Sequence, residues 1–330
     1  MPLLPTHLRA RWQALWHPDR YHGWGKQRQY FEGWYFKLVD ATEQHAYALI
    51  PGIAYDADGV GQAFVQVMDG KRHESHFHAF GVEDFRANPD AFEVHIGDNY
   101  FSATELRVAL PSIEGEVRMQ QLTPWPRQLY APGIMGWFSF VPFMQCYHGV
   151  TSLDHELSGA LRYGEQPVTS LDGGRGYTEK DWGRGFPRGY IWLQTNHFGT
   201  PEPTSLMATV AHIPWLGSYF VGFIVGFYYR GRLHRFATYD GSRRTTERVG
   251  ESGVLLTFKR GKYKLTIAAT KSRGGSLLSP VSGGMTGKVD ESLDAVIEVA
   301  FYHNDELVYA GQGHHAGLEV AGEVDILFNT

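Results

Sequence analysis

Short runs of apolar and aromatic residues, separated by turn dipeptides, recur along most of this chain. Outside residues 6–16, which could form one short helix, no stretch sustains the 3.6-residue apolar period of an α-helix. Strands at a spacing of roughly 8–12 residues, without helices between them, predict antiparallel sandwiches or barrels rather than a parallel α/β sheet. The clearest hairpin-type turns are Asp58-Gly59, Asp69-Gly70, Asp240-Gly241 and Asn304-Asp305.

The length of the chain favours two such domains. It has 330 residues, of which 39 are glycine and 14% are aromatic, so there is material for sharp turns and for a large core. At about 150 residues per domain, two domains are expected. The segment LDGGRG (171–176) is the most flexible-looking break. We therefore expect an N-terminal segment with a short helix at 1–24, a first β domain at 25–187 and a second at 188–330.

Charge and cysteine content exclude several classes of protein. The net charge of −5 argues against a broad nucleic-acid-binding surface, while leaving room for a local basic patch. A single cysteine, Cys146, excludes an intramolecular disulfide framework and a zinc site built from several thiolates. The N-terminus lacks the pattern of a secretory signal, so a cytoplasmic location is expected. No cofactor-binding motif stands out, and the glycine runs lack the lysine of a phosphate loop.

One uncharged segment raises the question of a membrane span. Residues Ile213–Tyr229 contain no charge, but 17 residues is at the short limit for a spanning helix. Pro214 and the glycines weaken a helix, whereas the aromatic and β-branched residues favour strands. We therefore expect a buried pair of strands and no transmembrane span.

The segment Tyr30–Lys37 (YFEGWYFK) is the first that could carry chemistry. Read as a strand, it places Glu32, Trp34 and Phe36 on one face. A carboxylate among large rings is either neutralised by a partner or raised in pKa, and a raised pKa makes a proton donor. Both interpretations of Glu32 stay open at this point.

The segment 176–187 (GYTEKDWGRGFP) is the second. In an extended conformation Tyr177, Glu179 and Asp181 face one way, and Lys180 and Trp182 face the other. This pattern is typical of a catalytic cluster and equally of an ion-paired corner of the fold.

The segment 190–197 (YIWLQTNH) is the third. Trp192, Gln194 and Asn196 share one face of the predicted strand. Such a face suits a ligand that is apolar along its body and polar at one end, and it also suits an ordinary amphipathic strand.

A pair of histidines is the only metal-like signal. His76 and His78 lie on one strand face, as in many metal sites, but the sequence shows no second cluster of ligands near them. We therefore expect ordinary polar strand histidines and no metal site. Metal binding by His76 and His78 stays open as the alternative.

Six segments, in order from about residue 20 to 322, resemble the tocopherol cyclase family. Two of them, FEGWYFK and YTEKDWGRGFPR, are specific motifs. More distantly, the chain is similar to carotenoid hydratases and lipocalin-type Diels–Alder cyclases. In two respects it departs from these patterns: Lys180 occupies the place of a suspected catalytic polar residue of the hydratases, and EVDILFNT stands where the family usually has a tryptophan-containing segment. The six segments are YHGWGKQRQYFEGWYFKL, GWFSFVPFMQCYHGV, GYTEKDWGRGFPRGYIWLQTNHF, YYRGRLHRFATYDG, SPVSGGMTGKVDESLDAVIEVAFY and HAGLEVAGEV.

The resemblance implies an all-β fold of two tandem lipocalin-like domains and the closure of a chroman ring on a prenylated quinol, without cofactor or metal. In this reaction an acid protonates a trisubstituted alkene, and the phenol oxygen traps the tertiary carbocation. On this interpretation Glu32 or Asp181 is the acid, and Tyr177 relays the phenolic proton.

The resemblance also implies binding roles. Trp34, Trp182 and Trp192 would present ring faces to the cation, and Gln194 and Asn196 would hold the quinol head group. The expected partner is a small hydrophobic isoprenoid, with peripheral membrane contact compatible with it. Two alternatives stay open: a non-catalytic carrier of an apolar ligand, and a related isoprenoid hydratase or pericyclic cyclase.

Overall fold

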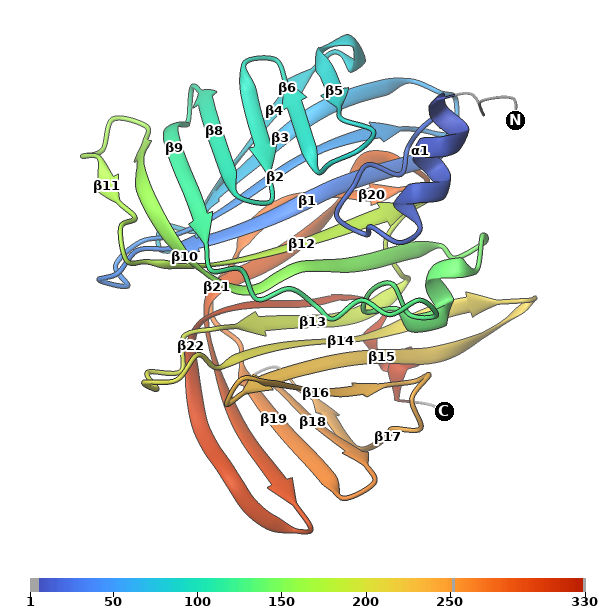
Figure 1. Ribbon diagram of the computed structural model, residues 1–330, viewed down its shortest axis with the longest axis vertical. Helices are drawn as coiled ribbons and strands as arrows, with labels where there is room; N and C mark the ends of the chain where they lie inside the picture. The colour runs from blue at the N-terminus through green and yellow to red at the C-terminus, as the bar shows by residue number, and fades with distance from the viewer. Residues whose placement is uncertain (1–5, 251–252, 329–330) are drawn as a thin grey trace. The chain divides into compact units, whose positions relative to one another are not determined.

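The structure, a computed structural model, describes residues 6–250 and 253–328. This part of the chain consists mainly of β-strands arranged in two antiparallel sheets (Figure 1). It contains one α-helix, α1 (Thr6–Ala14), and three short 3-10 helices: η1 (Val82–Asp84), η2 (Gly136–Phe140) and η3 (Val324–Leu327). The predicted all-β class with little helix is confirmed.

The first sheet has twelve strands. From one edge to the other their order is β4 (Glu74–Phe80), β3 (Gly61–Asp69), β2 (Ala46–Tyr55), β1 (Tyr30–Val39), β12 (Arg175–Gly183), β10 (Cys146–Tyr163), β9 (Ile113–Gln120), β8 (Glu105–Leu110), β7 (Asn99–Ser102), β6 (Glu93–Ile96) and β5 (Phe85–Ala87). The remaining strand, β11 (Thr169–Ser170), pairs with β10. Most neighbours are consecutive hairpins, and β12 is the exception that joins the two halves of the sheet.

The second sheet has ten strands. Their order is β16 (Arg232–Ala237), β15 (Ser218–Tyr229), β14 (Ser205–Trp215), β13 (Gly189–Thr195), β22 (Glu306–Gly322), β21 (Gly284–His303), β19 (Tyr263–Thr270), β18 (Gly253–Arg260) and β17 (Arg243–Val249). The tenth, β20 (Gly275–Val281), pairs with β21.

The chain divides into two compact units, with a change from one to the other between Phe186 and Pro187. Two short segments belong to a different unit from their neighbours in sequence: Gly70–His73 to the second, and Leu277–Lys288 to the first. Within the first unit, Met285 packs in an apolar cluster with Phe31. A segment from late in the chain thus completes the unit built from the first half.

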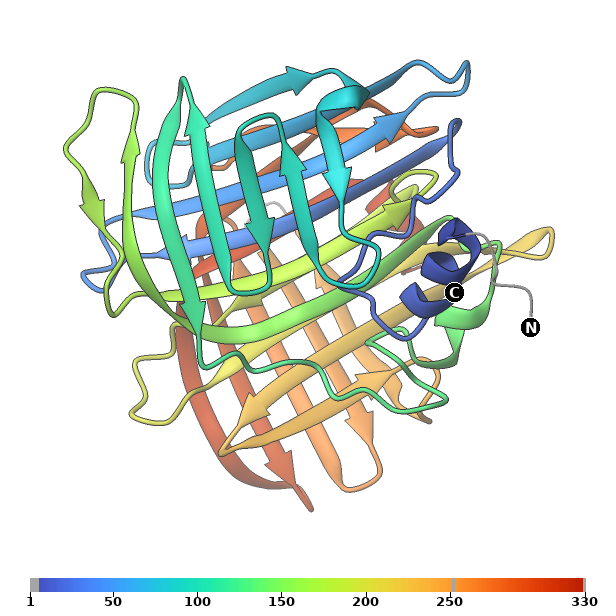
Figure 2. The ribbon, with the colours of Figure 1, turned by 45° about the horizontal axis from the view of Figure 1, so that its top comes forward.

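Each sheet curves around its own apolar core. In the first unit, β5–β9 lie over β1–β4 (Figure 2), and Trp34 of β1 stacks on Phe92 at 5.4 Å between ring centroids. In the second unit the core joins distant strands in the same way, since Phe223 of β15 meets Phe258 of β18 at 5.2 Å. Alternating inward side chains along each strand build these cores.

Three of the predicted hairpin turns, Asp58-Gly59, Asp69-Gly70 and Asn304-Asp305, join paired strands. Asp240-Gly241 is a turn but not a hairpin, because it joins β16 and β17, which lie at opposite edges of the second sheet. Asn304 and Asp305 both adopt positive φ, 51° and 63°, between β21 and β22, as a two-residue hairpin loop requires. The uncharged segment Ile213–Tyr229 forms the end of β14 and all of β15, which pair with each other. In the described residues, no helix is long and apolar enough to cross a membrane.

Candidate active site

Strand β12 carries most of the predicted site residues in the first unit, and the sheet register divides them between two faces. Trp182 pairs with Glu32 of β1, and Lys180 pairs with Trp34. Because paired residues in an antiparallel sheet point to the same side, these four side chains share one face. The alternation predicted for both segments is confirmed.

Tyr177, Glu179 and Asp181 point to the opposite face of the sheet. Asp181 pairs with Gly33, one residue along β1 from Glu32. The backbone of the sheet therefore separates the two carboxylates that the sequence offered as the acid of one site, Glu32 and Asp181. They belong to different environments, described in turn below.

Glu32 is fully buried, and its carboxylate is surrounded by donors. The backbone N–H of His22 donates to both oxygens, at 2.9 and 3.0 Å, the Tyr30 hydroxyl donates a further hydrogen bond, and the Lys180 ammonium forms an ion pair. Burial by itself raises the pKa of Glu32, but the charge of Lys180 and the contacts with His22 outweigh it, so the pKa is lowered. The interpretation of Glu32 as a proton donor requires a raised pKa, and the structure contradicts it.

Lys180 completes this buried group. Its ammonium also donates to the carbonyl oxygen of Arg20 and, at 2.7 Å, to Nδ1 of His22. It lies 4.9 Å from the ring centroid of Trp34 and 4.6 Å from that of Trp182. The two indoles that were expected to face a substrate carbocation thus face a cation of the protein itself, an arrangement that stabilises the ammonium.

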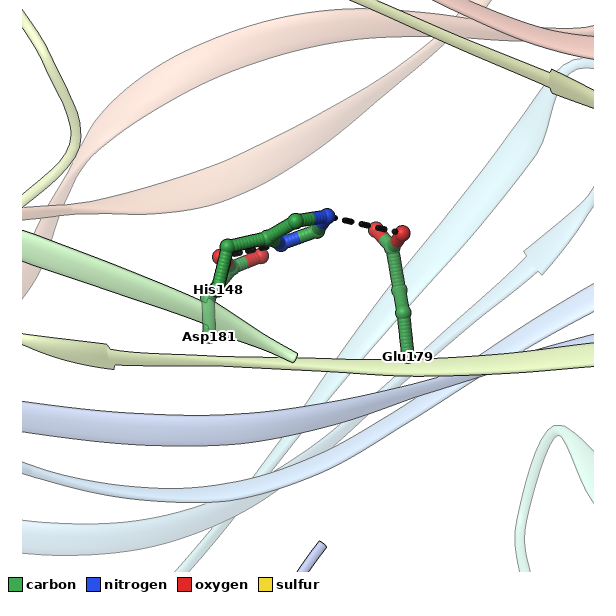
Figure 3. A group of neighbouring side chains, drawn as sticks. All are labelled: His148, Glu179 and Asp181. Carbon is green, nitrogen blue, oxygen red and sulfur yellow. Dashed lines mark hydrogen bonds and ion pairs between the residues drawn. The ribbon is translucent and has the colours of Figure 1, made fainter. Parts of the chain in front are cut away.

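The opposite face holds a chain of ionisable groups centred on His148 of β10 (Figure 3). Nδ1 of His148 lies 2.8 Å from Oδ1 of Asp181, and Nε2 lies 3.4 Å from Oε2 of Glu179. The hydroxyl of Tyr177 donates to the same Glu179 oxygen. Side-chain exposure rises along this chain from 5% at Glu179 through 13% at His148 to 24% at Asp181. Asp181 is therefore its accessible end.

Two neutral groups flank the ionisable groups Glu179, His148 and Asp181. Burial, with Glu179 next, raises the pKa of Tyr177 well above its ordinary value. Burial, with Asp181 next, raises the pKa of the Cys146 thiol, whose Sγ lies 3.9 Å from Asp181 Oδ1. Both groups keep their protons near neutral pH. Tyr177, Glu179, His148 and Asp181 thus form a series of neighbouring ionisable groups, joined by a hydrogen bond at each end and by an ion-pair contact of 3.4 Å between Glu179 and His148.

The same residues have the ligand types of a metal site, since one imidazole and two carboxylates lie within 4.8 Å of one another. In this structure the two carboxylates contact opposite nitrogens of His148. His76 and His78 have ring centroids 6.3 Å apart and, in the described part of the chain, belong to no three-ligand group.

An aromatic residue, Phe64, shares a row of the sheet with Asp181 but lies three strands away from it. Across β12, β1, β2 and β3, the register aligns Asp181, Gly33, Gly52 and Phe64 in one row. A Cβ on Gly52 would lie 2.4 Å from the Phe64 ring, and one on Gly33 would lie 3.9 Å from it. The ring therefore lies across both glycines toward the acid, a close approach that only glycine at position 52 permits.

The third predicted group, Trp192, Gln194 and Asn196, belongs to the second unit. All three are buried, at 6%, 0% and 4% exposure. Trp192 pairs with Glu319 of β22, whose carboxylate accepts a hydrogen bond of 2.5 Å from the Tyr190 hydroxyl. Their role in ligand binding stays a prediction.

His148, Phe64 and Glu319 were not singled out from the sequence. His148 is 33 residues from Asp181, and register shifts between β10 and β12 intervene, so no local spacing pairs them. Phe64 and Glu319 look like ordinary strand residues, because only strand order places them beside a predicted residue. The one signal in the sequence that could have drawn attention to His148 is its place two residues after the single cysteine, Cys146.

Together, these observations define an all-β protein of two lipocalin-like units, the first of which carries a group of two acids and a histidine on one face of its sheet. The family described as Tocopherol cyclase-like matches residues 111–322, which is well over half of the chain, and the protein belongs to this family. The resemblance recognised in the sequence motifs is confirmed.

Two plant proteins match over part of their length. The rice (Oryza sativa subsp. japonica) protein named "Probable tocopherol cyclase, chloroplastic" is 22% identical over 282 residues, covering 67% of this chain and 59% of the rice protein. The maize (Zea mays) protein "Tocopherol cyclase, chloroplastic" is 22% identical over 220 residues, covering 63% of this chain and 44% of the maize protein. The chain thus spans about half the length of these relatives.

Solved structures support the fold. Two crystal structures of CghA, one of them with Sch210972, are 12% identical with TM-scores of 0.58 and 0.59, covering 89% of this chain and 88% and 89% of theirs. An ATTH-type protein from Nitrosomonas europaea is 14% identical with a TM-score of 0.51, covering 89% of this chain and 93% of that one. At these identities the likeness concerns the fold.

Proposed function

We propose that this protein is an acid-initiated cyclase that closes a chroman ring on a prenylated quinol or a related isoprenoid, with Asp181 as the acid. The observation that carries the proposal is the series of ionisable groups from Tyr177 to Asp181, whose accessible end shares a row of the sheet with Phe64 across Gly33 and Gly52. Family membership supports the reaction class. Glu32 is not the acid in this proposal, because its lowered pKa and complete set of donors hold it ionised.

The chemistry balances without a redox cofactor. The carboxylic acid form of Asp181 gives its proton to the less substituted carbon of a trisubstituted alkene, leaving a tertiary carbocation. The phenol oxygen attacks this carbon, a C–O bond forms, and the phenolic proton passes to the Asp181 carboxylate. His148 and Glu179 hold or return that proton between turnovers, and Tyr177 forms the buried end of the path.

The surroundings of Asp181 meet two further needs of such a reaction. An aromatic face stabilises positive charge, and the Phe64 ring reaches over Gly52 toward Gly33, the residue paired with Asp181. Apolar walls exclude water, which would otherwise trap the cation as an alcohol. The apolar cluster of Phe31, Phe64 and Met285 lies on the same face of the sheet.

Peripheral membrane contact belongs to the same proposal, since a prenylated substrate partitions into lipid. Trp12 of α1 and Tyr130 are 64% and 70% exposed, and Trp137 of η2 is 47% exposed. Trp12 packs against Trp16 in a tilted arrangement with ring centroids 4.8 Å apart. The ring of Trp16 also contacts Phe140, so Trp12, Trp16 and Phe140 form one group. The indole N–H of Trp16 donates to the carbonyl of Leu129, the residue before Tyr130 in sequence. Exposed tryptophan and tyrosine are typical of membrane interfaces.

The test is incubation of the purified protein with a methylated prenyl benzoquinol under reducing conditions, in water and in D2O. The expected product has the mass of the substrate, a shifted retention time and, from D2O, one non-exchangeable deuterium per molecule. A product heavier by one water would indicate a hydratase, and an isomer without deuterium would indicate a pericyclic reaction. Tight binding without product across several tail lengths would indicate a carrier.

A further inference from the structure

The second unit contains a hollow that none of the preceding chemistry uses. It has a volume of about 250 Å³ and lies where β16 meets the turn between β18 and β19. These strands belong to the two ends of the second sheet (Figure 1), which approach each other there. The lining of the hollow contains no acidic residue. It contains four basic residues, Arg232, Arg235, Arg260 and Lys262.

Arg260 differs from the other three because its charge has a partner. Its guanidinium Nη1 donates to the carbonyl oxygen of Arg235 at 3.1 Å and lies 3.3 Å from Oδ2 of Asp240. These contacts join β18 to β16 and give Arg260 a structural role. Within residues 6–250 and 253–328, no carboxylate lies within 4 Å of the charged groups of Arg232, Arg235 and Lys262.

The floor of the hollow adds an aromatic ring and a neutral imidazole. The guanidinium of Arg232 and the ammonium of Lys262 lie 6.0 and 5.7 Å from the ring centroid of Tyr263. Burial, followed by the charges of Arg232 and His303, lowers the pKa of His234 to about 4. Near neutral pH His234 therefore adds a hydrogen-bonding group to the hollow without adding charge.

We propose that this hollow binds a small phosphate-bearing anion between Arg232, Arg235 and Lys262. Clustered cations without partners repel one another, and a polyvalent anion removes that repulsion. Guanidinium groups match phosphate oxygens in paired hydrogen bonds, and lysine adds a point charge. The hollow is smaller than the roughly 300–1,000 Å³ of sites that enclose a whole organic ligand, so it fits a phosphate or diphosphate group. The group can come from a soluble phosphate ester or from a lipid head group.

Two binding experiments test the site. The first is calorimetric titration with inorganic pyrophosphate, and the second is co-sedimentation with phosphatidylcholine vesicles prepared with and without phosphatidic acid. The variant is Arg232→Gln/Arg235→Gln, which leaves the structural contact of Arg260 to the Arg235 backbone carbonyl in place. The matched control is Lys271→Gln/Arg273→Gln, which removes the same charge from an exposed loop of the second unit. Both variants are first compared with the wild type by thermal unfolding.

We expect the site variant to weaken binding at least about tenfold while the control binds like the wild type. Selective loss of pyrophosphate binding identifies a soluble phosphate as the ligand type. Selective loss of binding to the acidic vesicles alone identifies a lipid head group. The proposal is overturned if the wild type binds neither probe, or if the two variants weaken binding equally. None of these outcomes depends on cyclase activity.

Discussion

Lys180 and Asp181 are neighbours on one strand, yet they belong to two opposite kinds of electrostatic environment. On the face of Lys180, every charged group is buried and compensated: the ammonium has Glu32, two further acceptors and two indole rings. On the face of Asp181, the carboxylate contacts His148 and the Cys146 thiol and is partly exposed. Both faces combine acids, a base and aromatic rings, so composition does not distinguish them.

The difference shows what separates a structural ion pair from a site that can transfer a proton. A carboxylate that accepts several hydrogen bonds and pairs with a buried ammonium is stabilised as an anion, and releasing a proton to an alkene requires the opposite. A carboxylate beside an imidazole that contacts a second acid can exchange its proton and regain it. The two side chains also differ in accessibility, since Asp181 is 24% exposed and Lys180 is fully buried.

The largest effect is expected from Asp181→Asn. Removing the acid should lower turnover by about 10²–10⁴-fold, because proton transfer contributes rate factors of that size. The fold should persist, since Asp181 is partly exposed. Product formation is measured by chromatography, and Asp98→Asn at an exposed turn is the control. If instead Glu32→Gln folds normally and abolishes turnover while Asp181→Asn does not, the roles of the two faces are reversed.

On the closed face, Lys180→Met should act on stability. It leaves Glu32 buried without its counter-charge, which costs about 3–5 kcal/mol of the free energy of unfolding. Urea unfolding measures this loss, and Glu32→Gln/Lys180→Met should recover part of it. Lys288→Met, at an exposed position of the first unit, should change the free energy by less than about 0.5 kcal/mol. If Lys180→Met and Lys288→Met lowered the free energy of unfolding equally, the ion pair would contribute nothing to stability.

A smaller effect is expected from Phe64→Leu. If the Phe64 ring stabilises the carbocation, its loss should lower kcat about 5–30-fold with little change in KM, the range of a desolvated cation–π contact. Steady-state kinetics with the prenyl quinol separates the two constants. Phe77→Leu, which removes the ring stacked on Phe64 at 5.4 Å, is the control. A loss in KM alone, or the same loss in both variants, would assign Phe64 to packing.

The smallest effect concerns pH. Because the pKa of Glu32 is lower in the folded protein than its ordinary value of 4.5, an unfolded chain takes up this proton first as the pH falls. The stabilisation from the pair is therefore complete above about pH 4.5 and is lost progressively below it. Urea midpoints between pH 7 and 3 should fall more steeply for the wild type than for Glu32→Gln/Lys180→Met, and parallel curves would contradict this.

Much of the local structure follows from the sequence. The turn dipeptides mark hairpins because few residues adopt positive φ at low cost, and Asn304-Asp305 is the clearest case. The alternation in YFEGWYFK and YTEKDW predicts which side chains share a face, because a strand repeats every two residues. In Ile213–Tyr229, Pro214, the glycines and the aromatic and β-branched residues favour the observed strands over a membrane helix.

What the sequence by itself determined is thus the all-β class, the faces of each strand and the family. Tertiary structure alone decided which ionisable groups lie together on each face of β12. It paired β10 with β12 to bring His148 between Glu179 and Asp181, and it placed His22 against Lys180, 158 residues away. These contacts depend on strand order and on register shifts, which no local periodicity encodes. The sequence left Glu32 open between a proton donor and a paired carboxylate, and only the strand order placed Lys180 beside it to form the ion pair.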